Sequence, residues 1–117
     1  MNLKQLADAL GLEHLTPGLP ADESKEITGG YCSDLLSDVL AHAPRGGILI
    51  TIQVHMNVIA VAVHAELAAV IFASDRNPDG EVIKTAAKEG VSLSRSPQCG
   101  FDVAGQLYAL GLRGSHE

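Results

Sequence analysis

Aromatic residues are scarce in this chain of 117 residues, which has no tryptophan and only two phenylalanines and two tyrosines. Proteins that hold single-stranded nucleic acid use aromatic rings as stacking platforms, so the composition argues against that partner. Basic residues are also few, with 8 Lys and Arg against 14 Asp and Glu, which gives a formal net charge of −6. This charge is unsuited to a phosphate backbone. We therefore expect no nucleic-acid partner.

Long hydrophobic runs and a leader sequence are absent as well. No apolar stretch is long enough to span a bilayer, and Met1 is followed by an amphipathic stretch that does not resemble a signal peptide. These features predict a soluble cytoplasmic protein that does not associate with membranes. A chain of 117 residues suits one domain with a single core. We expect this domain to cover residues 1–112 and to be followed by a frayed tail at residues 113–117.

Cysteine is limited to Cys32 and Cys99, which lack CxxC spacing and have too few partners for a zinc site. In a reducing compartment such cysteines are free thiols. Asp34, Asp38 and His42 recur at four-residue spacing on one helix face, but metal binding there would need a further ligand from elsewhere. We expect neither a metal nor a cofactor.

The apolar pattern predicts helices that alternate with short strands. Asn2 is expected to cap a first helix that Gly11 ends, and Ser33, Asn77 and Ser96 are expected to cap later helices. Strands are predicted at residues 13–16, 26–29, 48–53, 69–73 and 91–94. Residues 58–67 suit either a helix or the second strand of a hairpin, and their length and alanine content favour the helix. This alternation predicts a parallel or mixed sheet with helices on both faces.

Ligands in such folds bind beyond the carboxyl ends of the strands, where helix N-termini offer free amides. Small, hydroxyl, amide and imidazole side chains occur at these predicted junctions and would suit a small anion or a nucleotide. Residues 95–99 form a further junction of this kind. The predicted ligand-binding residues are Gly29, Gly30, Ser33, Asp34, Thr51, Gln53, His55, Asn57, Ser74 and Asp75.

Some of these residues also have a purely structural interpretation. His55 and Asn57 could contact a ligand or could cap the helix that follows them. The Gly29-Gly30 pair permits close backbone approach, as around a phosphate, but the chain has no phosphate-loop pattern. A small enzyme using Asp38 with His42, or His55, is a minor alternative. The chain lacks a coherent set of nucleophile, base and orienting group, so we expect no catalytic activity.

Two segments carry a family resemblance: GGYCSDLLSDVL at residues 29–40 and TIQVHMN at residues 51–57. They resemble stand-alone DRTGG-domain proteins, which are similar to the N-terminal domain of HPr kinase/phosphorylase. The resemblance implies a three-layer α/β/α domain, often dimeric, with a parallel or mixed sheet of about four or five strands. It does not imply kinase activity, because the kinase domain with its phosphate loop lies outside this part of the family.

The resemblance also implies a role in regulation or ligand sensing, and stand-alone members tend to be labelled serine-kinase-like or hydrogenase-associated. In fused members, an Asp-Arg pair and a Thr-Gly-Gly sequence follow the strands equivalent to residues 48–52 and 69–73. This chain has QVH at 53–55 and SDR at 74–76 instead. The leading hypothesis is a non-catalytic, homodimeric module that binds a small anionic ligand such as an adenine nucleotide. The alternative is a ligand-free interaction subunit of a hydrogenase-linked or kinase-linked signalling system.

Overall fold

The computed structural model describes residues 1–114 and has an α/β fold. The elements in chain order are α1 (Leu3–Leu10), β1 (Glu13–His14), α2 (Ala21–Ser24), β2 (Gly30–Cys32), α3 (Leu36–His42), β3 (Ile48–Thr51), α4 (Asn57–His64), β4 (Ala69–Phe72), α5 (Gly80–Glu89), β5 (Ser92–Arg95) and α6 (Gly100–Ala109). The strands form one five-stranded sheet in the order β1-β5-β4-β3-β2. Strands β2 to β5 run parallel, and β1 pairs antiparallel with β5. The predicted mixed sheet is confirmed.

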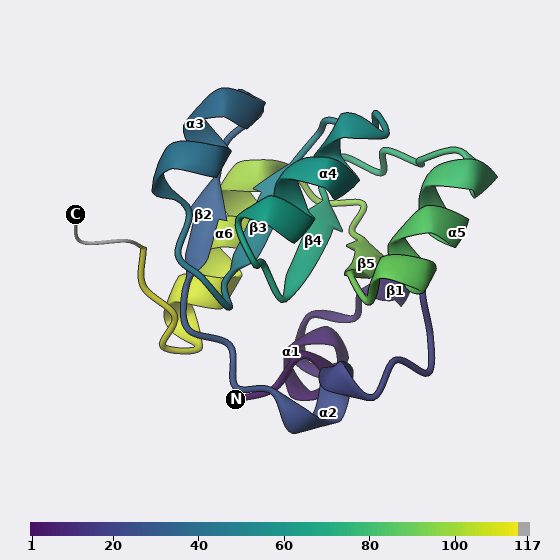
Figure 1. Ribbon diagram of the computed structural model, residues 1–117. Helices are drawn as coiled ribbons and strands as arrows, with labels where there is room; N and C mark the ends of the chain where they lie inside the picture. Colours follow the sequence, from purple (N-terminus) through teal and green to yellow (C-terminus); the bar gives the residue numbers. More distant parts are fainter. Residues whose placement is uncertain (115–117) are drawn as a thin grey trace.

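Helices cover both faces of this sheet (Figure 1). One face packs against α3, α4 and α5 through a core that includes Val39, Val58 and Val82. The other face packs against α1 and α6 through a second core that includes Leu6 and Val103. The predicted three-layer architecture is therefore confirmed.

The central strands form where the apolar runs predict them. All four residues of β3 are buried, as are all four residues of β4, which is the pattern of parallel strands covered on both faces. The segment after β3 is a helix and not the second strand of a hairpin, although it is rich in valine. Its Val58, Ile59 and Ala62 are buried on one side, because helical spacing brings them to the same face.

The caps of α1 are also as predicted. The Asn2 side chain accepts a hydrogen bond from the Gln5 amide, and the Gln5 side chain accepts one from the Asn2 amide. Gly11 ends the helix with a left-handed φ of 64°, which glycine adopts without steric cost.

Several predicted boundaries are wrong. The strand expected at 26–29 lies at Gly30–Cys32, and α2 is an additional short helix. Ser33 does not cap α3, which begins at Leu36, because its hydroxyl accepts the Leu35 amide in a local turn. The remaining two predicted caps also precede their helices: α5 begins at Gly80 and α6 at Gly100, past Asn77 and Ser96.

The end of the described chain lies against β2. The Arg113 carbonyl accepts the Gly30 amide at 3.0 Å, and residues 115–117 of the tail expected at 113–117 lie outside the described residues. Within residues 1–114, none of the helices has both the length and the hydropathy needed to cross a bilayer.

Candidate functional site at the carboxyl edge of the sheet

Most of the predicted ligand-binding residues gather at one edge of the sheet. Parallel strands β2, β3 and β4 end at the same side, so the residues that follow them become neighbours. Those that follow the strands or end them there are Ser33, Asp34, Thr51, Gln53, His55, Asn57, Ser74 and Asp75. The sequence therefore predicted the shared location of eight of the ten residues.

Asp34 joins the ends of β2 and β3. Its Oδ1 accepts the Thr51 hydroxyl at 2.8 Å and the Ile52 amide at 2.9 Å. The Thr51 Oγ1 in turn accepts the Gln53 amide at 3.1 Å. This carboxylate therefore fixes the backbone where the β3–α4 loop begins, which is a structural role within the candidate site.

The β4–α5 loop begins with two residues in the left-handed region, Ser74 at φ 57° and Asp75 at φ 58°. This conformation is costly for residues other than glycine, and such strain often marks functional sites. The Ser74 amide donates to the Gln98 carbonyl at 2.7 Å, and the Asp75 amide donates to the Ser96 carbonyl at 2.8 Å. The loops after β4 and β5 are therefore tied together at the centre of this edge.

These two loops then diverge, because α5 covers one face of the sheet and α6 covers the other (Figure 1). Junctions between adjacent strands whose connections leave toward opposite faces are where open α/β sheets bind ligands. Neither α5 nor α6 has a side-chain cap hydrogen bond at its N-terminus. Amides of the first turn are thus available beside this junction. Arg95 lies at the end of β5 with its Nε 3.6 Å from Asp75 Oδ1, and it also forms an ion pair with Glu13.

His55 has a defined structural contact. Its Nδ1 accepts the Asn57 amide at 3.1 Å and so caps α4. A ring nitrogen that accepts a hydrogen bond carries no proton, so the Nε2–H is the donor that His55 can offer outward. His55 and Asn57 are both exposed, which leaves them accessible to a ligand. The capping interpretation and the ligand interpretation of His55 are therefore compatible.

Gly29 and Gly30 do not join this site. Gly30 pairs with Ile48, the first residue of β3, so the two glycines lie at the amino-terminal edge. A Cβ on Gly29 would stand 2.6 Å from the Arg113 carbonyl oxygen, whereas one on Gly30 would meet nothing nearer than 3.9 Å. The close approach that Gly29 permits is to the C-terminal segment, so the prediction of these residues as ligand-binding is wrong in location.

Gly29→Ala is expected to lower the free energy of unfolding by about 1 kcal/mol, because the added Cβ pushes the terminal segment away from β2. Gly30→Ala is the matched control and is expected to leave stability unchanged or slightly higher, since its Cβ has room. Urea denaturation of the two variants checks this. Equal losses at both positions would refute the proposed contact.

Asp38, one of the minor catalytic candidates, has a structural partner on β2. Asp38 Oδ2 accepts the Tyr31 hydroxyl at 2.8 Å. This hydrogen bond, followed by desolvation and the carboxylate charge, raises the pKa of Tyr31. Within residues 1–114 no group of three or more His, Cys, Asp or Glu side chains is placed to hold a metal ion.

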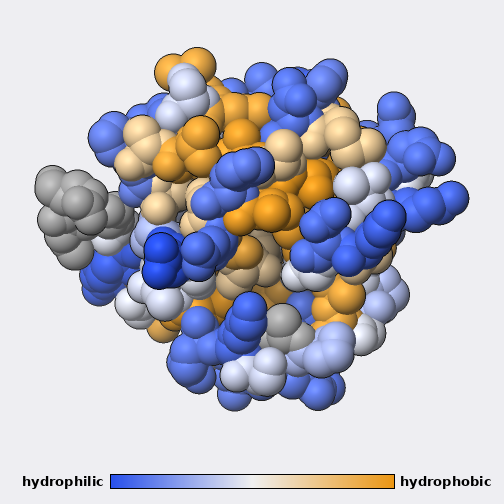
Figure 2. Space-filling view, viewed as in Figure 1, coloured by the Kyte–Doolittle hydropathy of each residue, from blue (hydrophilic) through white to orange (hydrophobic). Residues whose placement is uncertain are grey.

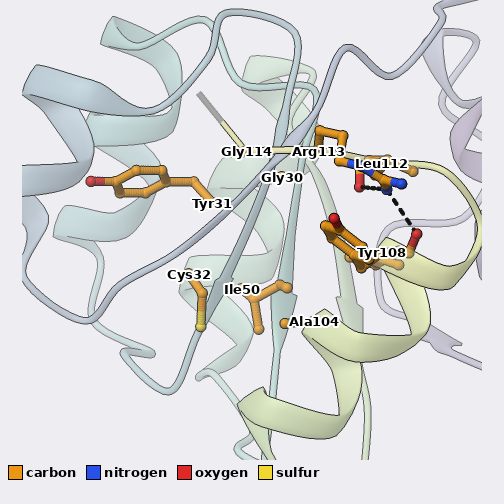
Figure 3. Close-up of a pocket in the computed structure, with 10 residues that line it drawn as sticks. Gly30, Tyr31, Cys32, Ile50, Ala104, Tyr108, Leu112, Arg113 and Gly114 are labelled. Atoms are coloured by element: carbon orange, nitrogen blue, oxygen red, sulfur yellow. Dashed lines mark hydrogen bonds between the residues drawn. The ribbon is translucent and has the colours of Figure 1, made fainter. Parts of the chain in front are cut away.

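An apolar cavity of about 130 Å³ lies between β2 and α6, lined in part by Cys32, Ile50, Leu107 and Tyr108 (Figure 3). Figure 3 shows Tyr31 pointing away from it, to the other side of β2. Both cysteines are free thiols. Burial, and then the Asp34 charge, raise the pKa of the Cys32 thiol, which opposes a nucleophilic role because the thiolate is disfavoured.

Comparison with known proteins identifies the fold. No protein-family model matches the chain, and no curated protein matches it by sequence. Among solved structures it is similar to the CBS and DRTGG domains of the regulatory region of Clostridium perfringens pyrophosphatase, which was crystallised with its activator, diadenosine tetraphosphate. The TM-score is 0.68 at 15% identity, over 91% of this chain and 45% of that one. The chain thus spans less than half of the regulatory region it matches.

This similarity supports a DRTGG- or CBS-like fold. At this level of identity it carries no residue roles. It does not bear on the expected similarity to the HPr kinase N-terminal domain, which stays a prediction.

Proposed function

We propose that this protein is a non-catalytic regulatory module that binds a small anionic ligand of the adenine-nucleotide class at the carboxyl edge of its sheet. The observation that carries the proposal is the junction where the loops after β4 and β5 part toward α5 and α6. That junction combines two strained residues, Ser74 and Asp75, with two helix N-termini that lack side-chain caps. The regulatory pyrophosphatase region of similar fold, crystallised with an adenine nucleotide, supports the ligand class.

The groups at this edge have separate roles in the proposal. Amides at the starts of α5 and α6 would donate to phosphate oxygens, and Arg76, exposed beside them, would supply positive charge. Gln53, Asn57 and the Nε2–H of His55 would donate to the base or ribose. Asp34 would position the β3–α4 loop without touching the ligand, because its Oδ1 already accepts two hydrogen bonds.

Calorimetric titration with AMP, ATP, diadenosine tetraphosphate and inorganic phosphate tests the proposal. His55→Ala is expected to weaken nucleotide binding about tenfold, the effect of losing one hydrogen bond to a charged or polar ligand group. His64→Ala is the matched control, because His64 is also exposed on α4 and bonds only the Ala60 carbonyl of its own helix. Failure of every nucleotide to bind, or equal weakening by the two variants, would refute the site.

Exposed apolar residues favour a protein partner, either a second copy of the chain, as in the homodimer of the leading hypothesis, or another protein, as in the alternative of a ligand-free interaction subunit. Phe101 is 87% exposed, Leu35 65%, Tyr108 59% and Leu40 52%. Figure 2 shows hydrophobic residues gathered on the face formed by α3 and α4, beside hydrophilic residues over α5. Contiguous exposed apolar patches, unlike single apolar side chains, are typical of surfaces that meet a partner.

Sedimentation velocity at micromolar concentration tests dimerisation, and a pull-down from cell extract tests for a signalling or hydrogenase-linked partner.

A further inference from the structure

Arg95 ends β5 at the carboxyl edge of the sheet, and its side chain is largely enclosed there, with only 24% exposed. Leu93, two residues earlier on the same strand, belongs to the core that also contains Val82 of α5. Residues two apart on a strand share a face, so Arg95 lies on the face of the sheet that α5 covers. Its guanidinium also lies beside Asp75, where the loops after β4 and β5 meet.

Two carboxylates contact this guanidinium in different ways. Glu13 on β1 is the register partner of Arg95, and its carboxylate forms an ion pair with Nη2. Paired residues of neighbouring strands point to the same face, so strand pairing holds this contact together. Asp75 Oδ1 is 3.6 Å from Nε, which is too long for a hydrogen bond. Glu13 is thus the anchor of the guanidinium, and Asp75 is a weaker second partner.

A stronger acceptor than Asp75 can therefore bind Arg95. A guanidinium carries five N–H donors, so Arg95 can keep Glu13 on one of them and bind phosphate oxygens with others. The Asp75 side chain is 67% exposed, so its carboxylate can turn into solvent. With one positive and two negative charges in this group, an incoming phosphate is repelled until the Asp75 carboxylate leaves.

We propose that Arg95 binds a phosphate group of the ligand directly, and that Asp75 is an internal competitor which this phosphate displaces. The inference rests on the anionic ligand proposed above and adds a regulatory contact to its site. Without ligand, the Asp75 carboxylate shields the guanidinium, and Glu13 keeps the arginine fixed in both states. The turn holds Asp75 in position, because its amide donates to the carbonyl of Ser96, the chain neighbour of Arg95.

Calorimetric titration with ATP tests this inference, with adenosine as the ligand that lacks phosphate. Asp75→Asn is expected to tighten ATP binding about two- to fivefold, the range that an exposed ion pair is worth. Asparagine tolerates left-handed backbone, so the turn keeps its shape. Arg95→Gln is expected to weaken ATP binding at least about tenfold, since charge-assisted hydrogen bonds to phosphate are lost. Neither variant should change the binding of adenosine.

A matched ion pair at the opposite edge of the sheet supplies the controls. Arg45 Nε is 3.2 Å from Glu66 Oε2, and these residues precede β3 and β4. Glu66 has a left-handed φ of 55°, close to the 58° of Asp75, so Glu66→Gln matches Asp75→Asn in both charge and backbone. Glu66→Gln and Arg45→Gln should bind ATP as the wild type does. Equal tightening by Glu66→Gln would show a general effect of net charge and would overturn the inference.

The outcomes separate this inference from the proposed function. If neither the wild type nor Asp75→Asn binds any nucleotide, both are wrong. If His55→Ala weakens ATP binding while the Arg95 and Asp75 variants leave it unchanged, the proposed function stands and this inference is wrong. Should Arg95→Gln fail to fold, Arg95→Lys and Asp75→Asn decide. Lysine keeps the charge but loses the paired hydrogen bonds, so Arg95→Lys should bind ATP more weakly than the wild type.

Discussion

Phe72→Ala is expected to lower the free energy of unfolding by about 3–5 kcal/mol. Phe72 ends β4 and is completely buried, in the core cluster that also contains Val58, Val82 and Leu93. Removing the ring forfeits its transfer free energy and leaves a cavity that the closely packed centre of the sheet cannot fill. Domains of this kind have a total stability of about 5–15 kcal/mol, so the variant approaches the limit of folding. Urea denaturation followed by circular dichroism measures the loss.

Phe101→Ala is the matched control, because it makes the same chemical change at a residue that is 87% exposed. We expect a change within about 0.5 kcal/mol, as at ordinary surface positions. Sedimentation of this variant adds a second readout: if Phe101 contacts a second copy, the substitution should shift the dimer toward monomer. A loss at Phe72 no larger than that at Phe101 would show that the core is wrongly placed.

The sequence was most informative where one physical requirement dominates. The run at 69–72 is apolar throughout and the run at 48–51 is apolar up to Thr51, and a strand covered on both faces buries every residue of such a run. The Asn2 and Gly11 signals were equally reliable. The Asn2 side chain accepts an amide at the start of α1, and the left-handed backbone of Gly11 ends the helix. These elements set the layers and thus the edge where the candidate site lies.

The wrong predictions arose where a residue that often caps a helix instead forms a turn, or where a strand lacks an apolar run. Ser33 and Ser96 accept amides two residues ahead, so they form tight turns instead of helix caps. The edge strand β2 has only three residues and none is buried, so it lacks the apolar run that marks a central strand. Misplacing β2 by a few residues moved Gly29 and Gly30 to the wrong end of the sheet.

Features that depend on contacts between residues distant in the sequence could not be predicted from local patterns. Ser74 and Asp75 have left-handed angles where their amides donate to the carbonyls of Gln98 and Ser96, and such a contact between distant loops has no signature in the local sequence. The contact of His14 with Ser92, 78 residues apart, likewise has no signature in local spacing.

Asp34→Ala is expected to lower the free energy of unfolding by about 2 kcal/mol, because one oxygen of this carboxylate, which follows β2, accepts two donors at the end of β3. Thr51 is only 2% exposed, so its hydroxyl would lose its acceptor in a place that water reaches poorly. The Ile52 amide would also lose its acceptor, and we expect its hydrogen exchange to accelerate by an order of magnitude or more. Urea denaturation and exchange at that single amide measure the two effects.

Asp34→Asn tests whether the loss of stability comes from the missing hydrogen-bond acceptor or from the missing charge. The asparagine keeps an oxygen in the position of Oδ1, so the loss of stability should be less than half that of the alanine variant. If the nucleotide site is where we propose, Asp34→Ala should also weaken nucleotide binding by loosening the β3–α4 loop that carries Gln53 and His55, while Asp34→Asn should largely preserve it. An alanine variant with wild-type stability and unchanged exchange at Ile52 would show that Asp34 does not organise this edge. Nucleotide binding that survives in a variant with a demonstrably loosened loop would instead place the ligand nearer the β4–β5 junction, where Asp34 has no hydrogen bond.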